Sequence, residues 1–323
     1  MHFSGEQKFD GPRIRAHLVE SSERQRDIEY AAAEEATPSA ERQRQREAAA
    51  AGHQARLPRI DEIVARFAEL DGRADISKVS RELTRILTEE GVDAALAYVD
   101  AQKPGILAEA HAQQAAARDR QRAKLEPLLS AANLQANKGQ TVAARAAYRE
   151  LLALDPAWPA VLESAAMFLH DQTILNRTHG TLAAAFADAE ESNTLATRLH
   201  TAYPTLPNVE RLLSATHIQM GDMLIRRGKD GDDDKALDHY THGFELADAL
   251  LKANPGSAEA TRDVVVSHYT MAGFAGSRGE AKDEEKHSRA VYDILKPAIE
   301  RGMTFDPPIV QLYEDLKARF SGK

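Results

Sequence analysis

The C-terminal half of the chain repeats itself at a fixed offset of 51 residues. Seven pairs of positions separated by this offset keep their residue identity, namely Ala202 and Ala253, Pro204 and Pro255, Arg211 and Arg262, His217 and His268, Met220 and Met271, Arg227 and Arg278, and Gly228 and Gly279. An internal duplication explains such agreement better than shared composition does. Duplicated helical segments favour stacked helical hairpins, each of which buries its apolar face against its neighbours.

The composition supports helices throughout the chain. Hydrophobic residues make up 43% and aromatic residues only 6% of the 323 residues, and alanine and leucine dominate the apolar supply. Both residue types lose little side-chain entropy in a helix. We therefore expect an all-α protein that begins with an N-terminal helical region.

Charge and cysteine content exclude several classes of protein. A formal charge of −9 does not indicate a nucleic-acid partner. The absence of cysteine excludes disulfides, thiol catalysis and cysteine-ligated zinc. No apolar run reaches the roughly 18–20 residues that span a bilayer, and the polar N-terminus lacks a signal-peptide core. We expect a cytoplasmic protein with no membrane and no nucleic-acid partner.

Three parts are expected along the chain. Residues 1–57 alternate charged residues, glutamine and alanine with few large apolar residues, which predicts a solvated or partner-dependent helical pair. Residues 58–122 form a helical subdomain, and residues 123–323 form the repeat array. Ser39 is expected to cap a helix that runs toward Arg56.

Within the second part, apolar residues recur at helical spacing in two segments, Ile60, Ile63, Val64, Phe67 and Leu70, then Val79, Leu83, Ile86 and Leu87. Gly91 is expected to end the second of these helices. A short helix over residues 92–101 should stop before Pro104, and a long helix should run over 104–122.

One segment of the array carries a family resemblance. Lys138, Gly139 and Gln140 are followed by Ala144, Tyr148, Leu154, Asp155 and Pro156, and preceded by Leu128, Ala131 and Ala132. In this order, residues 125–156 resemble a tetratricopeptide (TPR) unit. The resemblance implies that the repeat array forms a right-handed α-α superhelix after the N-terminal helical region. The resemblance implies that Gly139 separates two helices, that Ala144 allows them to approach closely, and that Tyr148 fills the groove between hairpins.

Later units depart from the standard motif. A first helix over 159–170 restarts in register, but residues 173–180 indicate an inserted loop, and the helix over 181–201 is longer than a standard repeat requires. The units after it are also stretched. Repeats of about 50 residues resemble those in bacterial multidomain signalling and defence proteins.

TPR proteins bind their partners through the concave surface lined by the first helix of each unit. By register, the groove candidates are Asn133, Asn137, Ser164, Asp171, Gln219, Asp222, Arg226, Tyr269, Thr270 and Ser277. The clamp that chaperone-binding members use for a terminal carboxylate is missing, because Leu129 and Ser164 replace clamp groups. The ligand is therefore not predicted to be a chaperone C-terminus.

Other chemical motifs favour structural interpretations. His217 and His268 occupy a repeated helical position and are interpreted as packing residues. The acidic run at residues 230–234 lacks the glycine and glutamate of a calcium loop, and fits a helix N-terminus. No nucleophile elbow, zinc-protease motif or phosphate loop occurs. We expect no catalytic residue, no metal and no cofactor.

These observations favour a scaffold or adaptor that holds another protein's peptide or helix, with the N-terminal helices as a second contact or a route to a homo-oligomer. The alternative is a regulatory or sensor subunit that gates a separate effector enzyme. A third possibility is a metal-dependent hydrolase that uses His217, His239 or His242.

Overall fold

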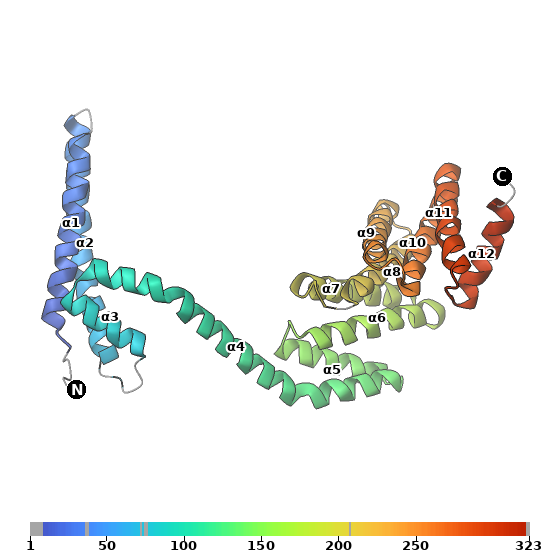
Figure 1. The fold of residues 1–323 in the computed structure, drawn as a ribbon, viewed down its shortest axis with the longest axis horizontal. Coiled ribbons are helices and arrows are strands. Elements are labelled where there is room, and N and C mark those ends of the chain that lie inside the picture. The colour runs from blue at the N-terminus through green and yellow to red at the C-terminus, as the bar shows by residue number, and fades with distance from the viewer. Residues whose placement is uncertain (1–8, 36–38, 72, 74–76, 207, 321–323) are drawn as a thin grey trace. The chain divides into compact units, whose positions relative to one another are not determined.

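A computed structural model describes residues 9–35, 39–71, 73, 77–206 and 208–320 of the chain. These residues form helices and no strand (Figure 1). The helices are α1 (Gly11–Glu34), α2 (Ser39–Asp71), α3 (Lys78–Glu89), α4 (Val92–Asn137), α5 (Thr141–Leu154), α6 (Pro159–His179), α7 (Leu182–Ala202), α8 (Val209–Arg227), α9 (Asp232–Ala253), α10 (Ala258–Ser277), α11 (Ala281–Glu300) and α12 (Pro307–Phe320). The expected all-α class is confirmed.

The chain divides into two compact units, Met1–Asp119 and Arg120–Lys323, and α4 runs through the division. The N-terminal end of α4 contributes Ala95 to the core of the first unit. Its C-terminal end contributes Leu129 and Ala132 to the core of the second. The three-part division expected from the sequence stays a prediction.

In the first unit, α1 packs along α2 through small and polar residues. Ala33 and Ala49 are buried, and the Ser22 hydroxyl lies 2.9 Å from His53 Nδ1. The Arg56 guanidinium donates a hydrogen bond to the same hydroxyl at 3.0 Å. A seam of small residues lets two helices approach closely despite few large apolar side chains. Near Gly91, α1, α3 and α4 share a small apolar core.

Two expected helix boundaries at prolines are wrong. Pro58 lies inside α2, and α4 continues from Val92 through Pro104 to Asn137. A proline in a helix interior removes one hydrogen bond and costs about 3 kcal/mol. Good helix formers flank Pro58, whereas Gly105 follows Pro104. Residue 100, whose carbonyl would accept the bond missing at Pro104, is exposed to water.

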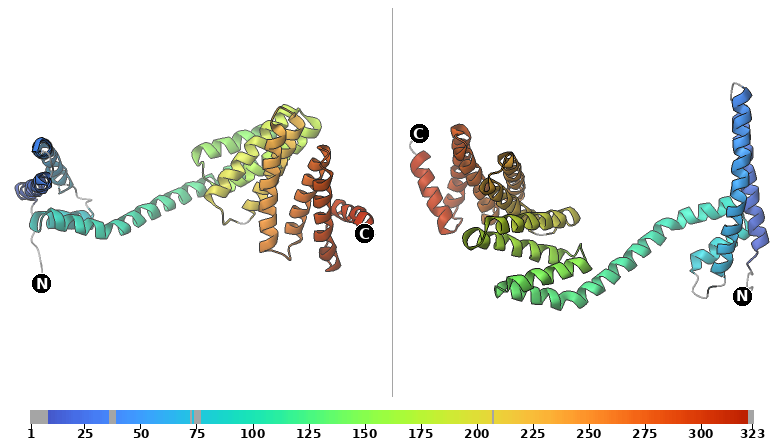
Figure 2. Two further views of the ribbon diagram at one scale, coloured as in Figure 1. Left: turned by 90° about the horizontal axis from the view of Figure 1, so that it is seen from above. Right: turned by 180° about the vertical axis from the view of Figure 1, so that it is seen from behind.

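In the second unit, each helix from α5 to α12 packs against the next one in sequence (Figures 1 and 2). The helices also stack as hairpins, because α6 contacts α8, and α8 contacts α10. Three apolar clusters follow one another along the chain, centred on α5 to α7, then α8 and α9, then α10 to α12. This arrangement is that of a helical solenoid.

The expected loop over residues 173–180 is also wrong, because α6 continues to His179 and Gly180 caps it. Thr173 is fully buried and donates a hydrogen bond to the Leu169 carbonyl at 2.9 Å. Asn176 donates to Asp188 of α7 at 2.7 Å. The burial of Thr173 and the bond from Asn176 to α7 are tertiary interactions that stabilise the last two turns, although threonine, asparagine and histidine are modest helix formers.

The unit with the TPR resemblance has the expected hairpin. Gly139 adopts a left-handed conformation, with φ of 72°, between α4 and α5, and Ala144 and Tyr148 are buried. Leu128, however, is 54% exposed, and Leu129 is buried instead. The face of α4 that meets α5 is thus displaced by about one residue from the expected register. Leu129 is consequently a core residue and does not point into a groove.

Candidate functional site

Two of the ten predicted groove residues hold helices together. The Tyr148 hydroxyl donates a 2.7 Å hydrogen bond to the Asn133 side chain, which joins α4 and α5. The buried Gln219 amide donates to the His170 carbonyl at 2.9 Å, which joins α8 and α6. Sequence register alone did not reveal these contacts, because they depend on how two helices are aligned.

Four other candidates line one open pocket of about 800 Å³ between α8, α9, α10, α11 and α12. They are Asp222, Tyr269, Thr270 and Ser277. We call this pocket the C-terminal groove. Its further lining includes Tyr240, Phe274, Glu284, Leu312, Leu316 and Arg319. Tyr269 is 58% exposed, so its ring is available for contact with another molecule.

Asp222 is the least exposed of the charged side chains that line the C-terminal groove, at 35% against 40% for Glu284 and 46% for Arg319. It accepts a 2.9 Å hydrogen bond from the Tyr240 hydroxyl and lies 3.7 Å from the Arg177 guanidinium. Burial raises the pKa of Asp222 above its ordinary value, and the hydrogen bond from Tyr240 opposes that rise. Burial and the adjacent Asp222 raise the pKa of the Tyr240 phenol as well. One oxygen of Asp222 is therefore already bound within the α8–α9 hairpin.

A second pocket, of about 400 Å³, lies between α6 and α8 and includes the predicted residue Asp171. We call it the α6–α8 pocket. Its other lining residues are Glu163, Met167, His170, Asn208, Arg211, Leu212 and Ala215. Of the remaining candidates, Asn137 and Arg226 are exposed and Ser164 is half-buried. None of these three lines either pocket.

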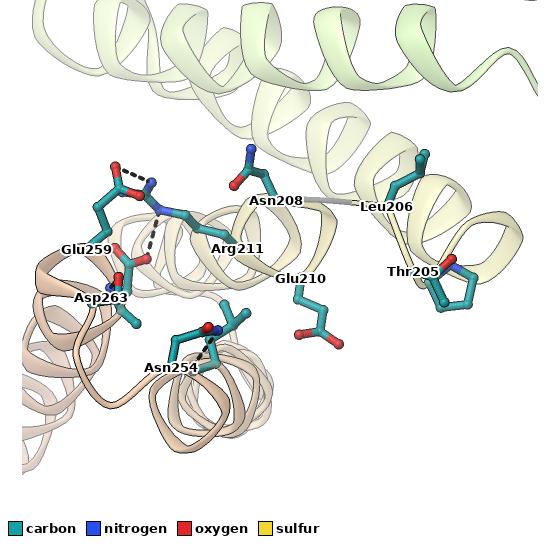
Figure 3. Close-up of a pocket in the computed structure, with 12 residues that line it drawn as sticks. Thr205, Leu206, Asn208, Glu210, Arg211, Asn254, Glu259 and Asp263 are labelled. Atoms are coloured by element: carbon teal, nitrogen blue, oxygen red, sulfur yellow. Dashed lines mark hydrogen bonds and ion pairs between the residues drawn. The ribbon is translucent and has the colours of Figure 1, made fainter.

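Arg211 also lines a third pocket, at the ends of α8 and α10 (Figure 3). Its guanidinium lies 3.0 Å from a Glu259 oxygen and 2.8 Å from a Asp263 oxygen. Burial raises the pKa of Asp263, although Arg211 favours its charged form. Asn208, at the start of α8, has a φ of 64°, a left-handed conformation that asparagine tolerates. The charge of Arg211 is thus directed toward α10.

The duplicated histidines form two equivalent pairs. His217 Nδ1 lies 2.9 Å from His239 Nδ1, and His268 Nδ1 lies 2.9 Å from His287 Nδ1. Each pair joins the first and second helix of one hairpin. Burial first, and the neighbouring imidazoles second, lower the pKa of His217 and of His268 to about 4. At neutral pH one ring of each pair donates and the other accepts.

The acidic run at residues 230–234 was expected to be an exposed N-terminal turn of a helix, and this expectation is confirmed in part. Asp233 and Asp234 are exposed in the first turn of α9, but Asp232 is buried. Asp232 accepts hydrogen bonds from the Arg227 guanidinium at 2.7 and 2.8 Å and from the Lys229 amide at 2.9 Å. The Arg227 bond, above all, lowers the pKa of Asp232 below its ordinary range. Asp232 therefore fastens the loop between α8 and α9.

His242 completes the histidine cluster, because its ring stacks on His217 at 5.5 Å between centroids. Even so, the described part of the chain contains no group of three or more histidine, aspartate or glutamate side chains arranged to hold a metal ion. Separately, no helix among the described residues has both the length and the apolarity to cross a membrane.

Several pocket residues were not predicted from the sequence. Leu312, Leu316 and Arg319 come from α12, which had no counterpart in the repeat register. The signal for α12 was present, because Ile309, Leu312, Leu316 and Phe320 recur at helical spacing after two prolines. Met167 lies 34 residues after Asn133, so the repeat register marks its place, although only Ser164 and Asp171 were predicted on this helix.

The described architecture defines the class as a helical repeat protein built from consecutive hairpins. Comparisons with known protein families, with curated protein sequences and with solved structures find no match to the chain.

Proposed function

We propose that the chain is a scaffold or adaptor that holds a peptide or helix of another protein in a groove formed by the first helices of a TPR-type, right-handed superhelix. The observation that carries this proposal is that four residues predicted from repeat register line a single 800 Å³ pocket. The pocket combines an exposed aromatic ring, Tyr269, with apolar walls and a few polar groups, a composition typical of binding sites.

A crosslinking experiment tests the proposal on the full chain. A photoreactive benzoylphenylalanine replaces Tyr269 in one protein and Glu245, on the exposed side of α9, in a matched control. We expect a discrete adduct with a cellular protein from position 269 only. Adding Ser277→Arg, which fills the groove, should abolish the adduct. Equal crosslinking from both positions, or an adduct unaffected by Ser277→Arg, would contradict the proposal.

No observation in the described residues favours the metal-dependent hydrolase, since no set of three ligands is assembled there. The regulatory-subunit alternative uses the same groove. Identifying the crosslinked partner as an enzyme whose activity changes on binding would convert the scaffold proposal into that alternative.

A further inference from the structure

The α6–α8 pocket has an apolar floor that is open to solvent. Met167 is 52% exposed, and Leu212 and Ala215 lie beside it half-buried. A methionine thioether is unbranched and polarizable, so it adapts to apolar groups of different shape. Ile174 and Leu175 of α6 are also exposed, at 41% and 50%, but of these three side chains only Met167 lines the α6–α8 pocket. The floor is suited to one apolar side chain of a partner.

Negative charge surrounds this floor. Glu163 lines the pocket and takes part in none of the ion pairs formed by the described residues. Asp171 is 74% exposed at its side chain, and its ion-pair contact is the His170 imidazole at 3.6 Å. Both carboxylates thus face the pocket without a lysine or arginine to neutralise them.

The one cation in the lining does not offset these charges. Arg211 places its guanidinium between Glu259 and Asp263 of α10, within 3.0 Å of each (Figure 3). Only its aliphatic stem remains to contribute to the α6–α8 pocket. The pocket is therefore apolar at its floor and acidic at its edge.

We propose that the α6–α8 pocket selects a partner segment in which an apolar side chain is accompanied by a lysine or arginine within about one helical turn. This inference rests on the proposed function and names the chemistry of its partner. The apolar side chain covers Met167 and Leu212, while the cation lies beside Glu163 or Asp171, which stand about one helical turn on either side of Met167. An acidic segment places like charges together, which disfavours it.

A selection experiment tests this specificity. The full chain is immobilised and a phage library of random 12-residue peptides is enriched against it. Enriched peptides are then synthesised, and their affinity is measured by fluorescence anisotropy for four proteins: wild type, Glu163→Gln with Asp171→Asn, Tyr269→Ala, and a control with Glu245→Gln and Glu285→Gln. The control removes the same charge from exposed positions on α9 and α11.

We expect enriched peptides to pair an aliphatic or aromatic residue with lysine or arginine within four positions. Their affinity should fall about fivefold in the Glu163→Gln, Asp171→Asn variant and stay unchanged in the control, because exposed ion pairs contribute modestly. Raising the salt concentration should weaken binding to wild type more than to the variant.

Three results would overturn the inference. Neutral or acidic peptides that lose affinity only with Tyr269→Ala would overturn the charge selection and leave the proposed function standing. Peptides insensitive to every groove substitution would overturn both. The third result would come from sedimentation velocity. If the wild type self-associates and the Glu163→Gln, Asp171→Asn variant does not, the occupant of the pocket is a second copy of the chain.

Discussion

The two histidine pairs make the stability of the array depend on pH. A histidine in the unfolded chain takes up its proton near pH 6.5, whereas the pKa of folded His217 and of folded His268 is about 4. Below pH 6.5 the unfolded state therefore binds more protons, and the free energy of unfolding falls as pH decreases toward 4. Between pH 7 and 5 we expect a loss of about 1–2 kcal/mol after solvent screening is allowed for. Urea unfolding at several pH values measures it.

Replacing His217 and His268 with glutamine provides the control, since glutamine keeps a donor and an acceptor but does not titrate. The double variant should lose a large part of the slope between pH 7 and 5, and the remainder should come from His239 and His287, whose pKa values burial also lowers. The raised pKa values of Asp222 and Asp263 act in the opposite direction at lower pH, so the comparison stays above pH 5. An unchanged slope in the variant would show that other groups cause the dependence.

Two helical glycines differ in the space around them, and this difference predicts opposite effects of alanine. A Cβ atom on Gly221 would lie 2.5 Å from the Tyr240 ring, which the hydrogen bond to Asp222 holds in place. Gly221→Ala should therefore destabilise the protein by about 1–3 kcal/mol. A Cβ on Gly273 meets nothing within 4 Å, so Gly273→Ala should stabilise α10 by up to about 1 kcal/mol. Chemical unfolding of both variants checks the prediction. If Gly221→Ala proved as stable as wild type, the close packing of α8 on α9 would be refuted.

At the scale of elements, α12 packs one of its faces against α10 and α11 at the end of the array. Ile309 is buried against the cluster of α10 and α11, whereas the adjacent Val310 is 42% exposed. Ile309→Ala should lower the free energy of unfolding by about 2 kcal/mol or more, and Val310→Ala by well under 1 kcal/mol. Thermal and urea unfolding of the two variants gives the comparison. Similar losses in both would mean that α12 is not packed through this face.

The sequence predicted most helices but misplaced some of their ends. Local rules end one helix near Arg56, just before Pro58, a second before Pro104 and a third after His170, because each place is locally unfavourable for a helix. The continuation of α6 depends on the bond from Asn176 to Asp188 of α7, and that contact follows from tertiary packing. The site shows the same limit. Repeat register predicted that Tyr269 and Ser277 belong to one groove, and both line the same pocket. Register did not predict that Gln219 binds the His170 carbonyl, because that bond depends on the distance between α8 and α6.

At the scale of the whole molecule, one stretch of α4 joins the two compact units. Residues 103–121 are all exposed, and none of them belongs to an apolar cluster of the described residues. Each unit, by contrast, has a core of its own, around Ile14 and Leu87 in the first and Leu129 and Leu162 in the second. Between the units the helix is therefore stabilised by the helix propensity of its alanine-rich sequence and not by packing. The free energy of local unfolding is low there.

Limited proteolysis tests this division of stability. Trypsin at low concentration should cut the full chain first within residues 103–121, at Arg118 or Arg120, because cleavage needs local unfolding and these exposed turns unfold at the lowest free energy. Two fragments that match the two units should then persist and keep their helical circular dichroism. The exposed Lys252 and Lys282, on α9 and α11 within the array, serve as internal controls and should be cut much later. Early cleavage at either lysine would contradict the prediction, since the packed hairpins would then open as readily as the joining helix.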